Sequence, residues 1–212
     1  MSDLRLTSTS IELSVASTQF ALSSRWEMRS MPSETYRLLV DQLNIMFAQD
    51  GLRFHSRRQA LPTPQSIAVE IDARFYDYVV LDGRRFHASS HANTPAQSLV
   101  EVHVPALNGV VRKEYGELVE ILQYDQLPGG RCIWLGHIRW FTRWEGQLPP
   151  SWQSAQPETD VRHWKIAEYR SFKDDNFSYP FIHLTWIKGY LARSVVTIKG
   201  QKVWATKAIR RA

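Results

Sequence analysis

The chain has 212 residues, a formal net charge of +5, 43% hydrophobic residues and 12% aromatic residues. A chain of this length and composition can bury a sizeable core, which excludes disorder throughout. The single cysteine, Cys132, excludes a framework of intramolecular disulfides, and the lack of a signal-peptide pattern or a long apolar run argues against secretion and membrane insertion. We therefore expect a soluble protein of a reducing compartment that makes no membrane contact.

Residues 1–65 predict an N-terminal extension with one amphipathic helix. Apolar and polar side chains alternate over 11–15, which is typical of a half-buried strand. A helix is predicted over 33–50, with Ser33 as its N-cap and Gly51 just past its end. Its apolar face has a spacing of three and four residues and consists of Tyr36, Leu39, Val40, Leu43, Met46 and Phe47. This face predicts core packing.

A basic loop with two prolines over 53–65 marks a boundary, after which the pattern changes to short β-type runs. Turn dipeptides such as Asp82-Gly83 and Asn108-Gly109 separate these runs. The Pro, Gln and Ser residues between Gly146 and Thr159 predict a surface loop. We therefore predict a mostly β fold, in which residues 66–212 form a β-barrel-like module and the extension with its helix packs onto it.

Four segments of this module carry much of its aromatic content. They are Tyr115-Gly-Glu-Leu-Val-Glu-Ile121, Ile138-Arg-Trp-Phe-Thr-Arg143, Trp164-Lys-Ile-Ala-Glu-Tyr-Arg-Ser-Phe172 and Leu184-Thr-Trp-Ile-Lys-Gly-Tyr-Leu-Ala-Arg-Ser-Val195. Their order, over roughly residues 75–200, resembles the bromo-adjacent homology (BAH) domain, a β-barrel-like module of chromatin proteins. The resemblance implies a nuclear protein without catalytic activity.

The same resemblance implies a recognition surface for a histone tail or another peptide. Family members that read histone tails hold a methylated ammonium between aromatic rings. Tyr115 and Trp140 match two of these rings, Thr142 stands where readers carry a further aromatic residue, and Trp144 is the substitute. This gives the hypothesis of a peptide reader or scaffold that uses Tyr115, Trp140 and Trp144. The alternative is that rings on a strand of period two are buried in the core.

The charge distribution favours nucleic acid as the partner. All acidic residues precede Asn176, and the acid-free segment that follows contains only basic charges. Together with Trp204, the cations predicted to contact DNA, RNA or a nucleosome are Lys188, Arg193, Lys199, Lys202, Lys207, Arg210 and Arg211. On a strand Lys202 and Trp204 face the same way, so a ring and a charge would be exposed together. The alternatives are a solvated basic tail and an edge strand that lysines protect from pairing.

The sequence contains no G-x-x-x-x-G-K-S/T, G-x-G-x-x-G, H-E-x-x-H or G-x-S-x-G motif. His87 and His91 have a spacing that suits a metal only in a helix, and their context predicts a loop. We therefore predict no enzyme, no cofactor and no bound metal. The alternative in the enzyme class is a metal-dependent nuclease built from Asp174 and Asp175, or from Glu158 and Asp160.

Overall fold

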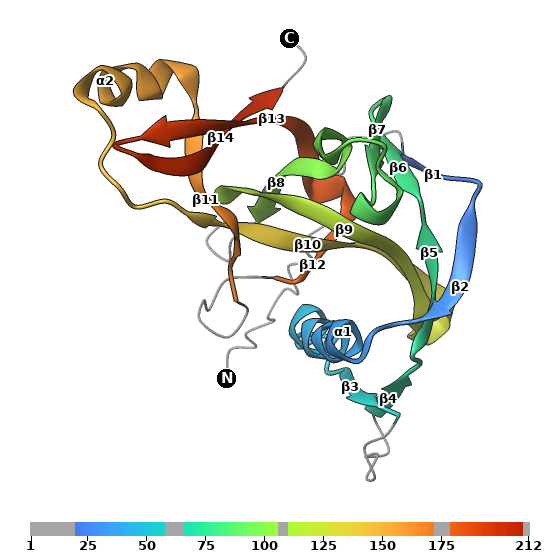
Figure 1. Ribbon diagram of the computed structural model, residues 1–212. Coiled ribbons are helices and arrows are strands. Elements are labelled where there is room, and N and C mark those ends of the chain that lie inside the picture. The colour runs from blue at the N-terminus through green and yellow to red at the C-terminus, as the bar shows by residue number, and fades with distance from the viewer. Residues whose placement is uncertain (1–19, 58–65, 106–109, 172–178, 210–212) are drawn as a thin grey trace, which may run out of the picture.

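The computed structural model describes residues 20–57, 66–105, 110–171 and 179–209, and the fold over these ranges is mostly β (Figure 1). The strands are β1 (Phe20–Leu22), β2 (Trp26–Ser30), β3 (Arg53–Ser56), β4 (Ser66–Val69), β5 (Asp72–Tyr76), β6 (Tyr78–Leu81), β7 (Arg84–His87), β8 (Leu99–Pro105), β9 (Val111–Leu127), β10 (Arg131–Arg143), β11 (Arg162–Tyr169), β12 (Phe181–His183), β13 (Ile187–Ile198) and β14 (Gln201–Ile209). The α-helices are α1 (Ser33–Met46) and α2 (Pro150–Thr159). The prediction of a mostly β fold is confirmed.

Six strands form a circuit of antiparallel pairings, which we call the strand circuit. β9 pairs with β10, β10 with β11, β11 with β14, β14 with β13, β13 with β8, and β8 with β9 again. One buried cluster takes a side chain from each of these strands: Leu99, Tyr115, Phe141, Trp164, Leu191 and Trp204. Because each of the six strands contributes a large side chain to this one cluster, the circuit has a packed interior.

Helix α1 covers a second core, on the part of the sheet formed by β5 and the far half of β9. Leu39 and Leu43 are fully buried there, in one cluster with Phe75 and Leu122. The Tyr36 hydroxyl donates to the Val69 carbonyl over 2.6 Å. The spacing of three and four residues that predicted the helix is the spacing that packs it here.

Two features of the helices differ from the prediction. Helix α1 ends at Met46, four residues before the predicted end, and residues 47–50 form turns. The segment predicted as a loop between Gly146 and Thr159 contains α2, which has Pro150 in its first turn and is followed by the C-cap residue Asp160 in the left-handed conformation. Proline suits the first turn of a helix because the amide it lacks has no partner there.

The predicted division at residue 65 runs through a shared sheet and a shared core. β2 belongs to the predicted extension, and it pairs along its whole length with β5 of the predicted β module. The strand predicted near residues 11–15 lies outside the described residues. None of the helices found in the described ranges has the length and apolar character needed to cross a membrane.

Candidate functional site

The predicted cations of the β13–β14 hairpin divide between its two faces. Directly opposite residues of an antiparallel pair share a face, and successive residues alternate. Arg193 lies opposite Thr206 and Thr197 lies opposite Lys202, which puts Arg193 and Lys202 on the face of Trp204. Lys207 lies opposite Ala192, on the other face. A register shift between Ile187 and Gly189 interrupts the alternation at Lys188. The cations that were predicted to contact nucleic acid together therefore do not share a single face.

Trp204 is a core residue, whereas a stacking surface for bases needs an exposed ring. Only 8% of Trp204 is exposed, and its ring centroid lies 5.4 Å from that of Phe141. The Arg193 guanidinium lies 4.3 Å from the centroid of the same ring. The prediction that the Trp204 ring is exposed is wrong. Strand β14 lies between β11 and β13, and its face that carries Trp204 points into the strand circuit. Arg210 and Arg211 lie outside the described residues.

The three rings of the predicted peptide surface do not converge. Trp140 lies opposite Gly116, so Trp140 and Tyr115 occupy opposite faces of the β9–β10 ladder. Trp140 is 2% exposed and its indole nitrogen donates to the Tyr179 carbonyl over 2.8 Å. Burial, which was the alternative at the sequence level, accounts for Trp140. Tyr115 and Trp144, in contrast, line one pocket.

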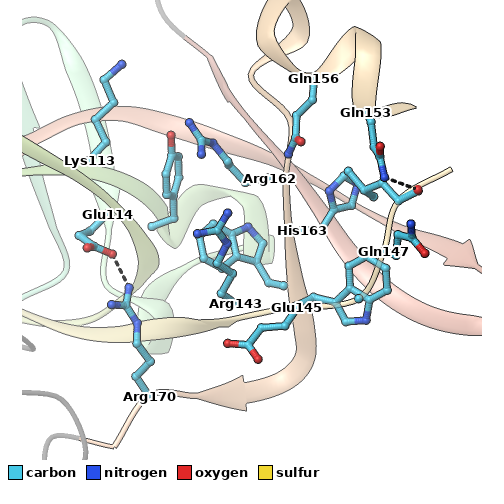
Figure 2. A pocket seen from close by; sticks show the side chains of 15 residues that line it. Lys113, Glu114, Arg143, Glu145, Gln147, Gln153, Gln156, Arg162, His163 and Arg170 are labelled. Atoms are coloured by element: carbon cyan, nitrogen blue, oxygen red, sulfur yellow. Dashed lines mark hydrogen bonds and ion pairs between the residues drawn. The ribbon is translucent and has the colours of Figure 1, made fainter. Parts of the chain in front are cut away.

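This pocket, which we call the polar pocket, has a volume of about 750 Å³ and lies where the start of β9, the end of β10 and the start of β11 meet α2 (Figure 2). The loop between β10 and α2 forms one wall. The lining side chains that carry charges or rings are Lys113, Glu114, Tyr115, Arg143, Trp144, Glu145, Arg162, His163, Trp164 and Arg170. It brings together polar and aromatic residues that are distant in the sequence.

The charged lining has a positive balance. Glu114 is 9% exposed, and it accepts from Arg170 and forms an ion pair with Arg112 at 2.6 Å. Figure 2 shows the Arg170 guanidinium directed at this carboxylate. Lys113 and Arg143 are exposed, and neither forms an ion pair with another described residue. Two exposed cations therefore stand beside a carboxylate that is already neutralised.

The rings of the polar pocket are held in fixed orientations. The half-buried Trp144 donates its indole N–H to the Gln201 side-chain oxygen over 2.9 Å. The Trp164 indole donates to the Thr206 hydroxyl over 2.7 Å, and the Trp164 and Tyr115 ring centroids are 5.4 Å apart. A ring that is fixed by its own hydrogen bond loses little freedom when a ligand stacks on it. Of these rings, Trp144 has the exposure that stacking requires.

His163 forms part of the wall between the polar pocket and α2. Its ring lies 6.2 Å from that of Trp144 and 6.0 Å from that of Trp152, measured between centroids. It is 8% exposed, and burial lowers the pKa of the imidazole below its ordinary value of 6.5. Its Nε2 atom has no hydrogen-bond partner among the described residues. Burial therefore favours the neutral form of the imidazole in the folded protein.

The sequence analysis missed Lys113, Arg143, Arg162 and His163. The sequence feature that could have indicated them is the direct succession of cations and aromatic rings at Arg143-Trp144 and Arg162-His-Trp164. These two segments become neighbours because Arg143 pairs with Trp164. Of the hairpin cations that were predicted, Lys199 comes close, because its ammonium donates to Gln147 of the pocket lining over 3.2 Å.

The described residues contain no group of three or more His, Cys, Asp and Glu side chains arranged to hold a metal ion. Of the acids considered for a nuclease, Asp160 accepts from Arg162 over 3.0 Å, and Asp174 and Asp175 lie outside the described residues. His91 lies in a short 3₁₀ turn near Asp77. No family model, no curated protein and no solved structure matches this chain.

Proposed function

We propose that the protein is a non-catalytic binding module whose polar pocket binds single-stranded nucleic acid. The observation that carries the proposal is the position of Lys113 and Arg143, both exposed and without ion pairs among the described residues, on the lining that Trp144 shares. Proteins recognise a single strand through two elements: cations that neutralise its phosphates and an aromatic ring on which a base stacks. We therefore propose the polar pocket, in place of the C-terminal hairpin, as the nucleic-acid-binding site.

The charges of the pocket favour an anion over a methylated ammonium. An aromatic cage binds a cation through the negative faces of its rings, and nearby guanidinium groups oppose that attraction. Tyr115 and Trp144 share the lining with Arg143 and Arg162, the buried carboxylate Glu114 is already paired with two arginines, and Glu145 is the one other carboxylate among the lining residues. If the ligand is a peptide, these charges require an acidic one.

The fold supports a barrel-like module as the frame of this pocket. The strand circuit returns to its first strand, and its interior holds one large buried side chain from each strand. Ligand sites are common at the mouths of such barrels. We extend the proposal to the suggested BAH relationship, to association with chromatin and to nuclear location, all of which rest on the sequence resemblance.

The test is a titration of a fluorescently labelled single-stranded oligonucleotide, followed by anisotropy. We expect Lys113→Glu with Arg143→Glu to weaken binding by about a hundredfold, since each cation that pairs with a phosphate contributes on the order of 1–1.5 kcal/mol. The matched control is Lys188→Glu with Lys207→Glu, which makes the same change of charge at two exposed residues of the hairpin. It should weaken binding only slightly.

Stacking is tested separately with Trp144→Ala and Trp144→Phe. Removal of the ring should weaken binding by about tenfold, as base stacking contributes roughly 1–3 kcal/mol, and phenylalanine should restore most of it. Equal weakening in the pocket and hairpin double variants would contradict the proposed site. Binding that is unchanged in every one of these variants would also contradict the site, and a native chain that does not bind the oligonucleotide would contradict the proposed function.

A further inference from the structure

Strand β2 is an open edge of the large sheet. In the order of hydrogen-bonded neighbours β2 stands at the end, and β5 is its sole partner among the described strands. Figure 1 shows β2 at the outer margin of the molecule, on the side away from α2. The backbone of an edge strand offers unpaired N–H and C=O groups to another strand.

Two large apolar side chains project from this edge. Trp26 is 52% exposed and Met28 is 55% exposed, and alternation along the strand places both on the same face. Edge strands of soluble proteins usually carry lysine, proline or a bulge that prevents pairing, and β2 pairs with β5 in an unbroken register. An edge of this composition is suited to pairing with another strand.

The charged side chains of β2 favour one register for antiparallel pairing with β2 of a second copy of the chain. Glu27 and Arg29 flank Met28 on the opposite face of the strand, where they form an ion pair with each other at 2.9 Å and Arg29 also pairs with Glu120 at 2.6 Å. If a second copy pairs antiparallel with its two-fold axis at Met28, Glu27 of each copy faces Arg29 of the other. An axis at Glu27 or at Arg29 would instead place like charges directly opposite each other, which is destabilising.

The same register brings the apolar residues together. Trp26 then lies opposite the small Ser30 of the other copy and diagonal to its Met28, within reach of long side chains. The two Met28 side chains meet at the axis, where the polarisable sulfur packs well against rings. The register with the axis at Met28 therefore pairs opposite charges on one face of the strand and brings apolar side chains together on the other.

We propose that the protein self-associates through β2, with two copies related by a two-fold axis at Met28 that join their sheets edge to edge. The interface is isologous, as most homodimer interfaces are. The contacting strand has five residues, so the association is weak and depends on protein concentration. It is independent of the polar pocket and of the function proposed for it.

Disulfide trapping in the full chain tests the position of the axis. Met28→Cys is made in a Cys132→Ser background, because Cys132 is the single native cysteine. Under mild oxidation we expect a covalent dimer from Met28→Cys. The control is Ile45→Cys, at a residue of α1 that is 59% exposed, and it should not form this dimer at the same concentration. Equal cross-linking of the two variants would overturn the proposal.

Sedimentation velocity over a range of concentrations tests the association without cysteines. Met28→Lys places two ammonium groups at the axis, and Glu27→Arg places arginines opposite each other. Each should weaken self-association by about tenfold or more, whereas Ile45→Lys should leave it unchanged. Circular dichroism melting checks that the variants fold. A native chain that stays monomeric at high concentration, or a folded Met28→Lys variant that associates as the native chain does, would refute the edge-to-edge dimer.

Discussion

The β13–β14 hairpin and the polar pocket both contain cations and tryptophans, but they arrange them in opposite ways. In the hairpin the cations lie on both faces and Trp204 points into the strand circuit. In the pocket, residues from β9, β10 and β11 are directed at one volume, and Trp144 keeps an exposed surface beside Arg143. The comparison shows that a local excess of charge in the sequence does not make a surface, because strand alternation divides the excess.

The largest expected effect concerns the role of the tryptophans. Trp204→Ala should lower the free energy of unfolding by about 3–5 kcal/mol, because it removes a buried ring from the interior of the strand circuit. Trp152→Ala, at a ring that is 41% exposed, should cost clearly less. Urea denaturation of both variants measures the difference. Equal and small decreases would mean that Trp204 is not part of the core.

The next effect concerns salt, which separates the pocket from the hairpin more sharply than a single affinity does. If Lys113 and Arg143 both bind phosphates, replacing the pair should flatten the plot of log affinity against log salt by about 0.7 per phosphate that is no longer neutralised. Lys188→Glu with Lys207→Glu should leave this slope nearly unchanged. Measurement of oligonucleotide binding at several salt concentrations gives the slopes, and a flattening confined to the hairpin variant would reverse the assignment.

The smallest effect concerns His163, which lies between the pocket and α2. Burial lowers its pKa in the folded protein, so the unfolded chain takes up the proton at a higher pH than the folded chain does. The stability associated with the neutral imidazole is therefore complete above pH 6.5 and is lost as the pH falls from 6.5 through the lower folded pKa.

Thermal melts of His163→Gln and the native chain, from about pH 8 to about pH 5, test this sign. The variant should lose less stability on acidification than the native chain does. Some pH dependence should persist in the variant, because burial also lowers the pKa values of His87 and His183. Parallel curves for the two proteins would show that His163 does not titrate as its burial implies.

Local pattern was a good guide wherever a single element buries a single face. The spacing from Tyr36 to Leu43 predicted a helix, and these residues pack in the core that α1 covers. The short apolar runs with turn residues between them predicted a mostly β chain, which the structure confirms. The predicted end of α1 was four residues too late, and α2 was not predicted, since its proline-rich and polar segment carries little periodicity.

Local pattern failed wherever the pairing partner decides the outcome. Period two correctly predicted that Lys202 and Trp204 share a face, but that face points toward the interior because β14 has neighbours on both sides. The same limit applied to Tyr115 and Trp140, whose separation follows from the register of β9 against β10. Sequence spacing contains no information about register between distant strands.

The sequence by itself determined the β-rich composition of the fold, the amphipathic face of α1 and the concentration of cations near the C-terminus, because these depend on residue type and on spacing within one segment. The tertiary structure decided which rings are buried, which cations share a face and where the pocket lies. These properties depend on strand neighbours far apart in the chain, such as Arg143 opposite Trp164, and the physical cause is that each pairing fixes the face of every side chain it includes.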